Sequence, residues 1–244
     1  MKRLLCITAH PDDEAGNFGG TLLKSAAAGN QTLLICLTAG EAARNRGRAV
    51  DNEDLAAIRT RELARSCELL KIGAHQVWSF ADGKLMEANF HEVTGRLVKV
   101  IRDFQPHVVL TLGPEGGITG HPDHAMAGLA ATAAFHWAGR EQFFPQQAKL
   151  PHQAARLFYG TAERNPPHMP TVPLPPIDVR VDIAAYFETK LAAFQAHSTQ
   201  APLFERFAGF ARQMGGVECF HLAAAPAGFD SSALIASGDL FHAL

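Results

Sequence analysis

The feature that most constrains the fold is a short apolar run at residues 4–7, followed almost at once by the turn HPDDE at residues 10–14. A buried strand that leads into a polar turn and then a helix is typical of an α/β protein, whose ligands bind at the carboxyl ends of parallel strands. The turn holds one imidazole and three carboxylates, which are costly to place in a simple connection. The sequence therefore predicts a functional site at the end of the first strand.

A second cluster, HPDH at residues 121–124, follows another apolar run at residues 107–112. The two clusters at two strand ends are expected to form one metal site. A catalytic zinc site takes three His or carboxylate ligands and keeps one position for water. His10, Asp13 and one histidine of the second cluster fill that set, and His124 is favoured because it lies inside the following helix and is better held. Zn²⁺ suits these ligands, with Fe²⁺, Mn²⁺ or Co²⁺ as other occupants.

Two more polar groups beside these ligands suit a hydrolysis. Zinc lowers the pKa of its bound water from about 16 to about 7, and Asp12 is the natural base for the remaining proton. His121 could polarise the attacked carbonyl or protonate the leaving group. The residues alone thus predict a hydrolase acting on a carbonyl or phosphoryl centre. Glu14 is expected only to support the helix start through the helix dipole.

The rest of the chain alternates apolar runs with amphipathic segments, which indicates βαβ units and a mainly parallel sheet flanked by helices. Strands are expected at residues 3–9, 32–38, 77–80, 107–112, 156–160, 177–181 and 217–222, and helices at residues 21–28, 53–71, 90–104, 121–137, 183–196 and 202–214. The chain of 244 residues is expected to form one domain. We place its core at about residues 1–139 and a smaller C-terminal extension at about residues 140–244, because the composition becomes rich in proline there.

Composition argues against several classes of protein. The net charge is −2 with both signs interspersed, unlike a general nucleic-acid or membrane-surface binder. No run approaches the roughly 20 apolar residues of a membrane span. The four cysteines lack CxxC spacing and are expected to be reduced thiols of a cytoplasmic protein. The oligomeric state stays open, and a homo-oligomer is compatible with the sequence.

The polar loop at residues 39–52 leaves the end of a predicted strand and carries Arg44, Arg46 and Arg48. It is long for an α/β connection. A lid over the site and an ordinary solvated loop are both open interpretations. As a lid, its arginines would suit a substrate that carries a carboxylate or a phosphate.

These motifs together resemble the PIG-L/LmbE-like zinc-dependent de-N-acetylase family. The resemblance is carried by AHPDDE at residues 9–14 and GHPDH at residues 120–124, with weaker support from LTAGE at 37–41, RTREL at 59–63, FADG at 80–83 and KLAAFQAHSTQ at 190–200. It implies a Rossmann-like fold and a mononuclear zinc site. It also implies removal of the acetyl group from an N-acetylglucosamine-type sugar conjugate, with release of acetate and a free amine.

The resemblance assigns residues as well. The metal ligands fall on His10, Asp13 and His124, the general base on Asp12, and the acid or intermediate-stabilising histidine on His121.

Further assignments rest on the resemblance alone. Asp123 joins the catalytic residues by orienting a histidine, while Arg59, Asp82 and His197 are expected to bind the substrate. A helix-surface salt bridge for Arg59 and a plain turn position for Asp82 are the simpler alternatives. Thr119 stands where some relatives carry a tyrosine that assists the carbonyl oxygen, and threonine is too short for that reach.

Two other functions stay open at this point. One is a metal-dependent hydrolase of another bond, such as a phosphoester, although such enzymes often use two ions and the ligands here suffice for one. The other is a non-catalytic metal- or sugar-binding module, which would not need Asp12 and His121.

Overall fold

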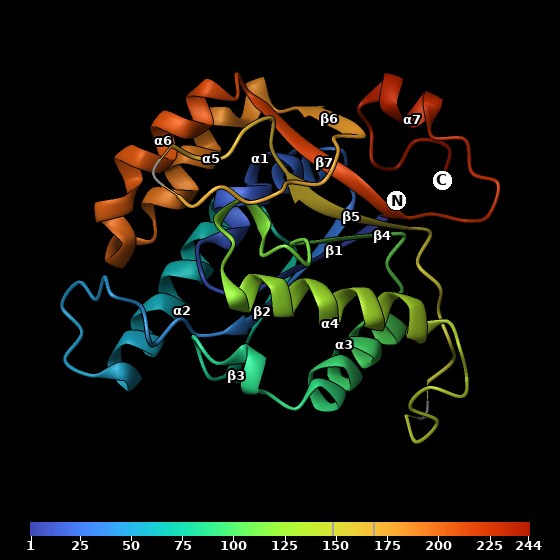
Figure 1. The fold of residues 1–244 in the computed structure, drawn as a ribbon, viewed down its shortest axis with the longest axis horizontal. Helices are drawn as coiled ribbons and strands as arrows, with labels where there is room; N and C mark the ends of the chain where they lie inside the picture. The colour runs from blue at the N-terminus through green and yellow to red at the C-terminus, as the bar shows by residue number, and fades with distance from the viewer. Residues whose placement is uncertain (148, 168) are drawn as a thin grey trace.

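A seven-stranded sheet forms the centre of the computed structural model, which describes residues 1–147, 149–167 and 169–244. The strand order is β3-β2-β1-β4-β5-β7-β6 (Figure 1). The strands are β1 (Arg3–Thr8), β2 (Gln31–Thr38), β3 (Ala74–Phe80), β4 (Val108–Thr111), β5 (Arg156–Thr161), β6 (Val179–Asp182) and β7 (Val217–Ala224). β1 to β5 pair in parallel, and β7 is antiparallel to both of its neighbours, β5 and β6. The predicted α/β fold with a mainly parallel sheet is confirmed.

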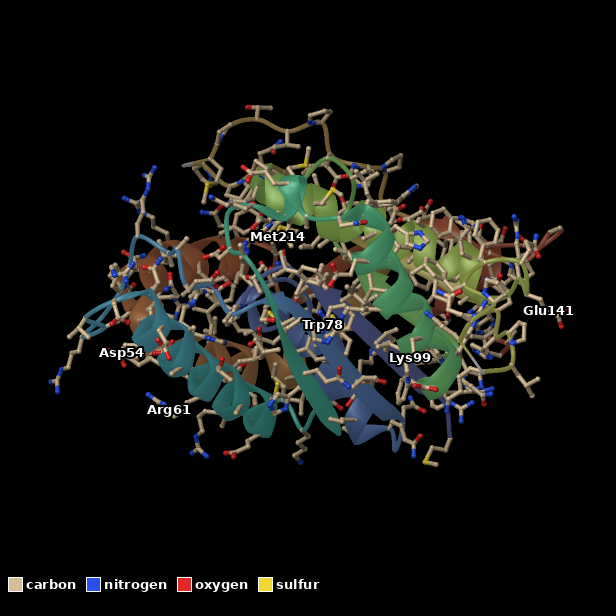
Figure 2. All side chains as sticks on the ribbon, turned by 90° about the horizontal axis from the view of Figure 1, so that it is seen from below. Asp54, Arg61, Trp78, Lys99, Glu141 and Met214 are labelled. Carbon is tan, nitrogen blue, oxygen red and sulfur yellow. The ribbon has the colours of Figure 1, made fainter. Side chains whose placement is uncertain are left out.

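Helices cover both faces of this sheet (Figure 1). They are α1 (Asp13–Ala27), α2 (Asn52–Leu69), α3 (Phe90–Phe104), α4 (Pro122–Ala138), α5 (Phe187–Gln195), α6 (Phe204–Gln213) and α7 (Ser232–Ser237), with short 3₁₀ turns η1 (Leu85–Glu87), η2 (Gly117–Thr119), η3 (Ala184–Tyr186) and η4 (Ser198–Leu203). α3 packs against α4, and α1 packs against α5. Seen from below, Trp78 of β3 lies beside α3 (Figure 2), where the guanidinium carbon of Arg96 is 4.2 Å from its ring centroid.

The central strands are continuous apolar runs because helices cover both of their sides. In β1, residues 4–7 are completely buried, and β4 is buried along its whole length. All four cysteines are free and buried, as the sequence predicted. Among the described residues, no helix is both long and apolar enough to cross a membrane.

The first helix begins earlier than predicted. We expected it at residues 21–28, but α1 begins at Asp13 and includes Gly16, Gly19 and Gly20. Gly20 allows close packing, because a Cβ added there would lie 2.5 Å from Cδ1 of Ile183. The short helix α7 was not predicted at all.

The segment after residue 139 adds three strands to the same sheet. β5 pairs with β4, and β7 and β6 follow outward from it. The placement of a core at residues 1–139 and an extension at residues 140–244 stays a prediction.

Candidate metal centre and active site

The two clusters meet because the strands before them are neighbours. β1 and β4 pair in parallel, so the loops that follow them leave the sheet at the same edge. The first loop leads directly into α1, and the second leads through η2 into α4.

Three donor atoms converge at this edge. His10 Nδ1 lies 3.2 Å from His124 Nε2, and His124 Nε2 lies 3.1 Å from Asp13 Oδ1. The other oxygen of Asp13 is 3.7 Å from His10 Nδ1. A tetrahedral ion with ligands at about 2.0–2.2 Å separates its ligand atoms by roughly 3.3–3.6 Å. Two imidazole nitrogens that face each other beside a carboxylate therefore suit a cation between them.

The three residues predicted as ligands are thus brought together, and they form a possible metal site. Donor atoms of His10, His121 and His124 also lie within 4.8 Å of one another. The shorter separations favour Asp13 over His121 as the third ligand. His121 has another contact, because its Nδ1 accepts a hydrogen bond from the backbone N–H of Asp123 at 3.1 Å.

His10 is oriented by two carboxylates on its other ring nitrogen. Its Nε2 lies 3.1 Å from Asp123 Oδ2 and 3.1 Å from Asp82 Oδ1, so this nitrogen carries the proton and Nδ1 faces the centre. Burial lowers the pKa of His10, but hydrogen bonds to Asp123 and Asp82 outweigh it and raise the pKa to about 10. The carboxylates therefore favour positive charge at this ring, which either a proton or a cation bound at Nδ1 supplies. Asp123 itself is fixed by the backbone N–H groups of Gly83 at 2.7 Å and Leu85 at 3.0 Å.

Asp12 lies beside this centre in an unusual backbone conformation. Its φ is 109°, a value that L-residues rarely adopt and that surrounding contacts must hold. Its backbone N–H donates to Glu14 Oε2 at 3.0 Å, and its Oδ2 is 3.0 Å from a guanidinium nitrogen of Arg59. Burial raises the pKa of Asp12 to about 6, against the lowering effect of Arg59. Such a carboxylate is well matched to proton transfer near neutral pH.

Arg59 does not lie where either expectation placed it. It is buried rather than exposed on the surface of α2. Its guanidinium donates to the carbonyl oxygens of Gly40 and Pro11 as well as to Asp12. Gly40 has a φ of 69°, and a Cβ there would overlap the guanidinium. Arg59 thus holds the turn and the Asp12 carboxylate, and it presents little surface to a substrate.

His197 is also placed differently from the prediction. Its side chain has no exposed surface, so it offers no atom for direct contact with a substrate. Its Nε2 lies 2.7 Å from Glu14 Oε1, which also accepts from Ser66 Oγ at 2.6 Å. Burial lowers the pKa of His197, but the Glu14 carboxylate outweighs it and raises the pKa.

The expectation that Glu14 only supports the helix start was wrong. Rather than only supporting the helix start, its completely buried carboxylate joins α2, the segment after α5 and the backbone of Asp12. Burial raises the pKa of Glu14, whereas His197 and Ser66 lower it by more, so the net shift is downward. Both partners lie in recognisable motifs, HPDDE at residues 10–14 and AHST at residues 196–199. Nothing in the sequence indicated that Glu14 and His197 contact each other.

Asp82 lies behind His10, and His121 lies beside it at the start of α4. One oxygen of Asp82 contacts His10, and the other accepts from the backbone N–H of Ala42 at 2.8 Å. His121 is the N-cap residue of α4 and is exposed. Because its Nδ1 accepts a hydrogen bond, its Nε2 carries the proton in the neutral form. Burial and the neighbouring His10 and His124 lower the pKa of His121, which favours that neutral form.

Thr119 has a role that sequence reasoning missed. Its hydroxyl lies 3.0 Å from His124 Nδ1, so it orients the ring whose other nitrogen faces Asp13.

The polar loop at residues 39–51 is fastened at Asn45, whose backbone oxygen accepts from Gln200 at 3.2 Å. Whether this loop acts as a lid or as a solvated connection stays a prediction.

A cavity of about 510 Å³ opens beside the centre. Asp12, Asp13, His121 and His124 line one end of it. The site is therefore accessible to a small molecule, and Asp12, the donor cluster and His121 face the same space.

Comparison with known proteins agrees with this arrangement. The family model described as PIG-L, GlcNAc-PI de-N-acetylase, matches residues 5–135. A 1D-myo-inositol 2-acetamido-2-deoxy-alpha-D-glucopyranoside deacetylase of Rhodococcus opacus is 30% identical, over 82% of this chain and 82% of its own length. A diacetylchitobiose deacetylase of Thermococcus kodakarensis is 34% identical, over 83% of this chain and 71% of its own.

A solved structure is similar as well. The N,N'-diacetylchitobiose deacetylase of Pyrococcus horikoshii superimposes with a TM-score of 0.75 at 25% identity, covering 91% of this chain and 83% of its own. The match to the family model covers more than half of the residues, and the relatives are similar across most of the chain. The chain therefore belongs to the PIG-L family of GlcNAc-PI de-N-acetylases, as its two histidine motifs predicted.

Proposed function

We propose that this chain is a zinc-dependent deacetylase that hydrolyses the acetamide of an N-acetylglucosamine-type conjugate. The observation that carries the proposal is the convergence of His10 Nδ1, His124 Nε2 and the Asp13 carboxylate beside Asp12 and a cavity. The names of the similar proteins supply the class of substrate.

His10, Asp13 and His124 are the residues that would hold the ion. When bound, a zinc ion supplies polarisation of the amide carbonyl and acidification of water. Fe²⁺, Mn²⁺ or Co²⁺ could occupy the same site, because these ions also accept nitrogen and oxygen ligands.

The protein side chains carry out the proton transfers and hold the ligands in position. Asp12 accepts a proton from the attacking water, for which a pKa of about 6 suits neutral pH. Asp12 then passes this proton to the departing nitrogen, while the N–H at Nε2 of His121 donates a hydrogen bond to the oxygen of the attacked carbonyl, so the C–N bond breaks with release of acetate and a neutral amine. Asp123 and Asp82 keep His10 in the required tautomer.

The experiment is an Asp12→Asn variant, loaded with zinc, with bound metal and released amine both measured. We expect unchanged zinc content and a fall in kcat of roughly 10²–10⁴-fold, the usual contribution of a general base. Asp230→Asn, at an exposed position outside the cavity lining, is the matched control and should keep full activity. Undiminished turnover in Asp12→Asn would exclude this residue as the base.

The same assay separates the other two functions. A phosphoesterase would release phosphate from a phosphoester panel and no amine from the acetylated sugars. A binding module would take up the ion and the sugar and release nothing from either panel.

A further inference from the structure

The cavity is much longer than the reacting group requires. It begins at Asp12 and His124 and continues between α1, α5 and α6 to the far end of α6, in the region where these helices lie together (Figure 1). Its volume of about 510 Å³ is that of a whole small-molecule site, typically about 300–1,000 Å³. An acetamide group fills only a small part of it.

Beyond the metal centre much of the wall is apolar. Phe194 and Phe207 stack with their centroids 4.0 Å apart, which fixes one wall. Phe210 and Met214 of the α6 region and Phe187 of α5 also line the cavity, all of them half-buried. Aromatic and thioether surface of this kind gains free energy when an apolar group displaces water from it.

The two buried charged groups of this part, Lys190 and Glu218, are paired with each other, while Glu205 and Arg206 of α6 line it from exposed positions. Lys190 Nζ lies 2.6 Å from Glu218 Oε1, and both side chains are buried. The Glu218 carboxylate also accepts from the backbone N–H groups of Gly20 at 2.9 Å and Thr21 at 2.8 Å. A charged ligand would have to compete with these contacts, whereas an uncharged one would not.

We infer that the substrate carries an uncharged apolar group that fills this part of the cavity while its acetamide lies at the metal centre. The inference rests on the proposed function and names the kind of conjugate. The apolar group is either the aglycone of the sugar or an N-acyl chain longer than acetyl. Both would present the same uncharged, apolar surface to the cavity. The side of the amide from which it extends is decided by the experiment.

The test uses the zinc-loaded protein and two substrate series below their micelle concentrations. One series is the methyl, butyl and octyl glycosides of N-acetylglucosamine. The other is methyl glucosaminide carrying an N-acetyl, N-butanoyl or N-octanoyl group. We expect kcat/KM to rise in one series by up to about fourfold for each added methylene, the effect of burying one CH₂ group. The series that rises identifies the source.

In the series that rises, the Phe210→Ser variant is expected to reduce the ratio of kcat/KM between the longest and the shortest member by at least about tenfold, because a half-buried aromatic surface is removed. Ile235→Ser on α7, where the side chain is 49% exposed and outside the cavity lining, should leave that ratio unchanged. The thermal midpoints of both variants show whether they are folded, and the two wild-type series decide the question without either of them.

The outcomes separate this inference from the proposed function. Amine release that is equal for short and long members of both series overturns the inference and leaves the deacetylase proposal intact. If no substrate releases amine, the deacetylase proposal fails. Calorimetric titration with methyl and octyl glucosaminide then tests the cavity by itself: tighter binding of the octyl compound supports it, and equal binding overturns it.

Discussion

Replacing His197 with leucine should destabilise the protein far more than the loss of one surface residue. Both His197 and Glu14 are completely buried, and their contact of 2.7 Å is one of the three hydrogen bonds that satisfy the carboxylate. Removing His197 leaves the buried carboxylate with two hydrogen bonds and no ionic partner, and breaking a buried pair in this way costs about 3–5 kcal/mol. For a chain of this size, 1 kcal/mol corresponds to roughly 2–4 °C, so the thermal midpoint should fall by about 6–20 °C.

The design of the experiment separates charge from packing. Urea denaturation at pH 7 gives the free energy of unfolding of wild type, His197→Leu and His197→Gln. The glutamine variant keeps an N–H donor toward the carboxylate and should recover part of the loss. Glu14→Gln combined with His197→Leu removes the buried charge and should be more stable than His197→Leu alone. A loss below about 1 kcal/mol in His197→Leu would refute the view that Glu14 depends on this partner.

Activity should change along with stability, because Glu14 also holds the backbone of the proposed base. Its second oxygen accepts the N–H of Asp12, the residue with a φ of 109°. In His197→Leu assayed well below its thermal midpoint, we expect kcat to fall more than KM rises. A change confined to KM would mean that His197 acts through the substrate after all.

Three further predictions follow from the fold and the metal centre. Chelation should lower the thermal midpoint, since an ion at 1,000 times its Kd stabilises the native state by about 4 kcal/mol; Asp13→Asn should shrink this difference, and an equal difference in that variant would argue against Asp13 as a ligand. Gly20→Ala should cost about 1–3 kcal/mol of overpacking, because the new Cβ would meet Ile183, and an unchanged urea midpoint would contradict that contact. Burial and the nearby Arg3 lower the pKa of His107 below its usual 6.5, so the unfolded chain binds a proton more readily, and stability should fall as the pH drops below about 6.5. His107→Gln should flatten that part of the stability profile, and an identical slope would show that other groups cause it.

The fold was largely predictable because its strands are buried on both sides. Runs such as residues 4–7 and 108–111 admit few other structures, and the turn after each of them indicates which end of the strand is used. The start of α1 was not predictable in the same way. Glycine disfavours helices by about 1 kcal/mol, and only the later segment around Ile183, which packs against Gly20, explains why the helix tolerates it.

The candidate site was predictable where its residues are close in sequence. The motifs at residues 10–14 and 121–124 contain the groups that converge on the metal centre, whereas Asp82 contacts the outer nitrogen of His10. The contacts of Arg59 and His197 were not predictable, because each depends on a partner 47 or 183 positions away. A motif residue can be buried and can position the site residues through hydrogen bonds. The sequence pattern does not distinguish such a residue from one that contacts the substrate.

The position of β1 next to β4 has a consequence that concerns the scaffold rather than the ligands. The chain leaves these two neighbouring strands toward opposite faces of the sheet, with α1 on one side and α4 on the other (Figure 1). The loops therefore diverge and open a crevice at this point in the winding order, whatever side chains they carry. The order of the strands creates the crevice, and the HPDD and HPDH motifs only supply the side chains that line it. A new ion or reaction could thus be installed by exchanging a few loop residues, with the sheet and its buried strands left as they are.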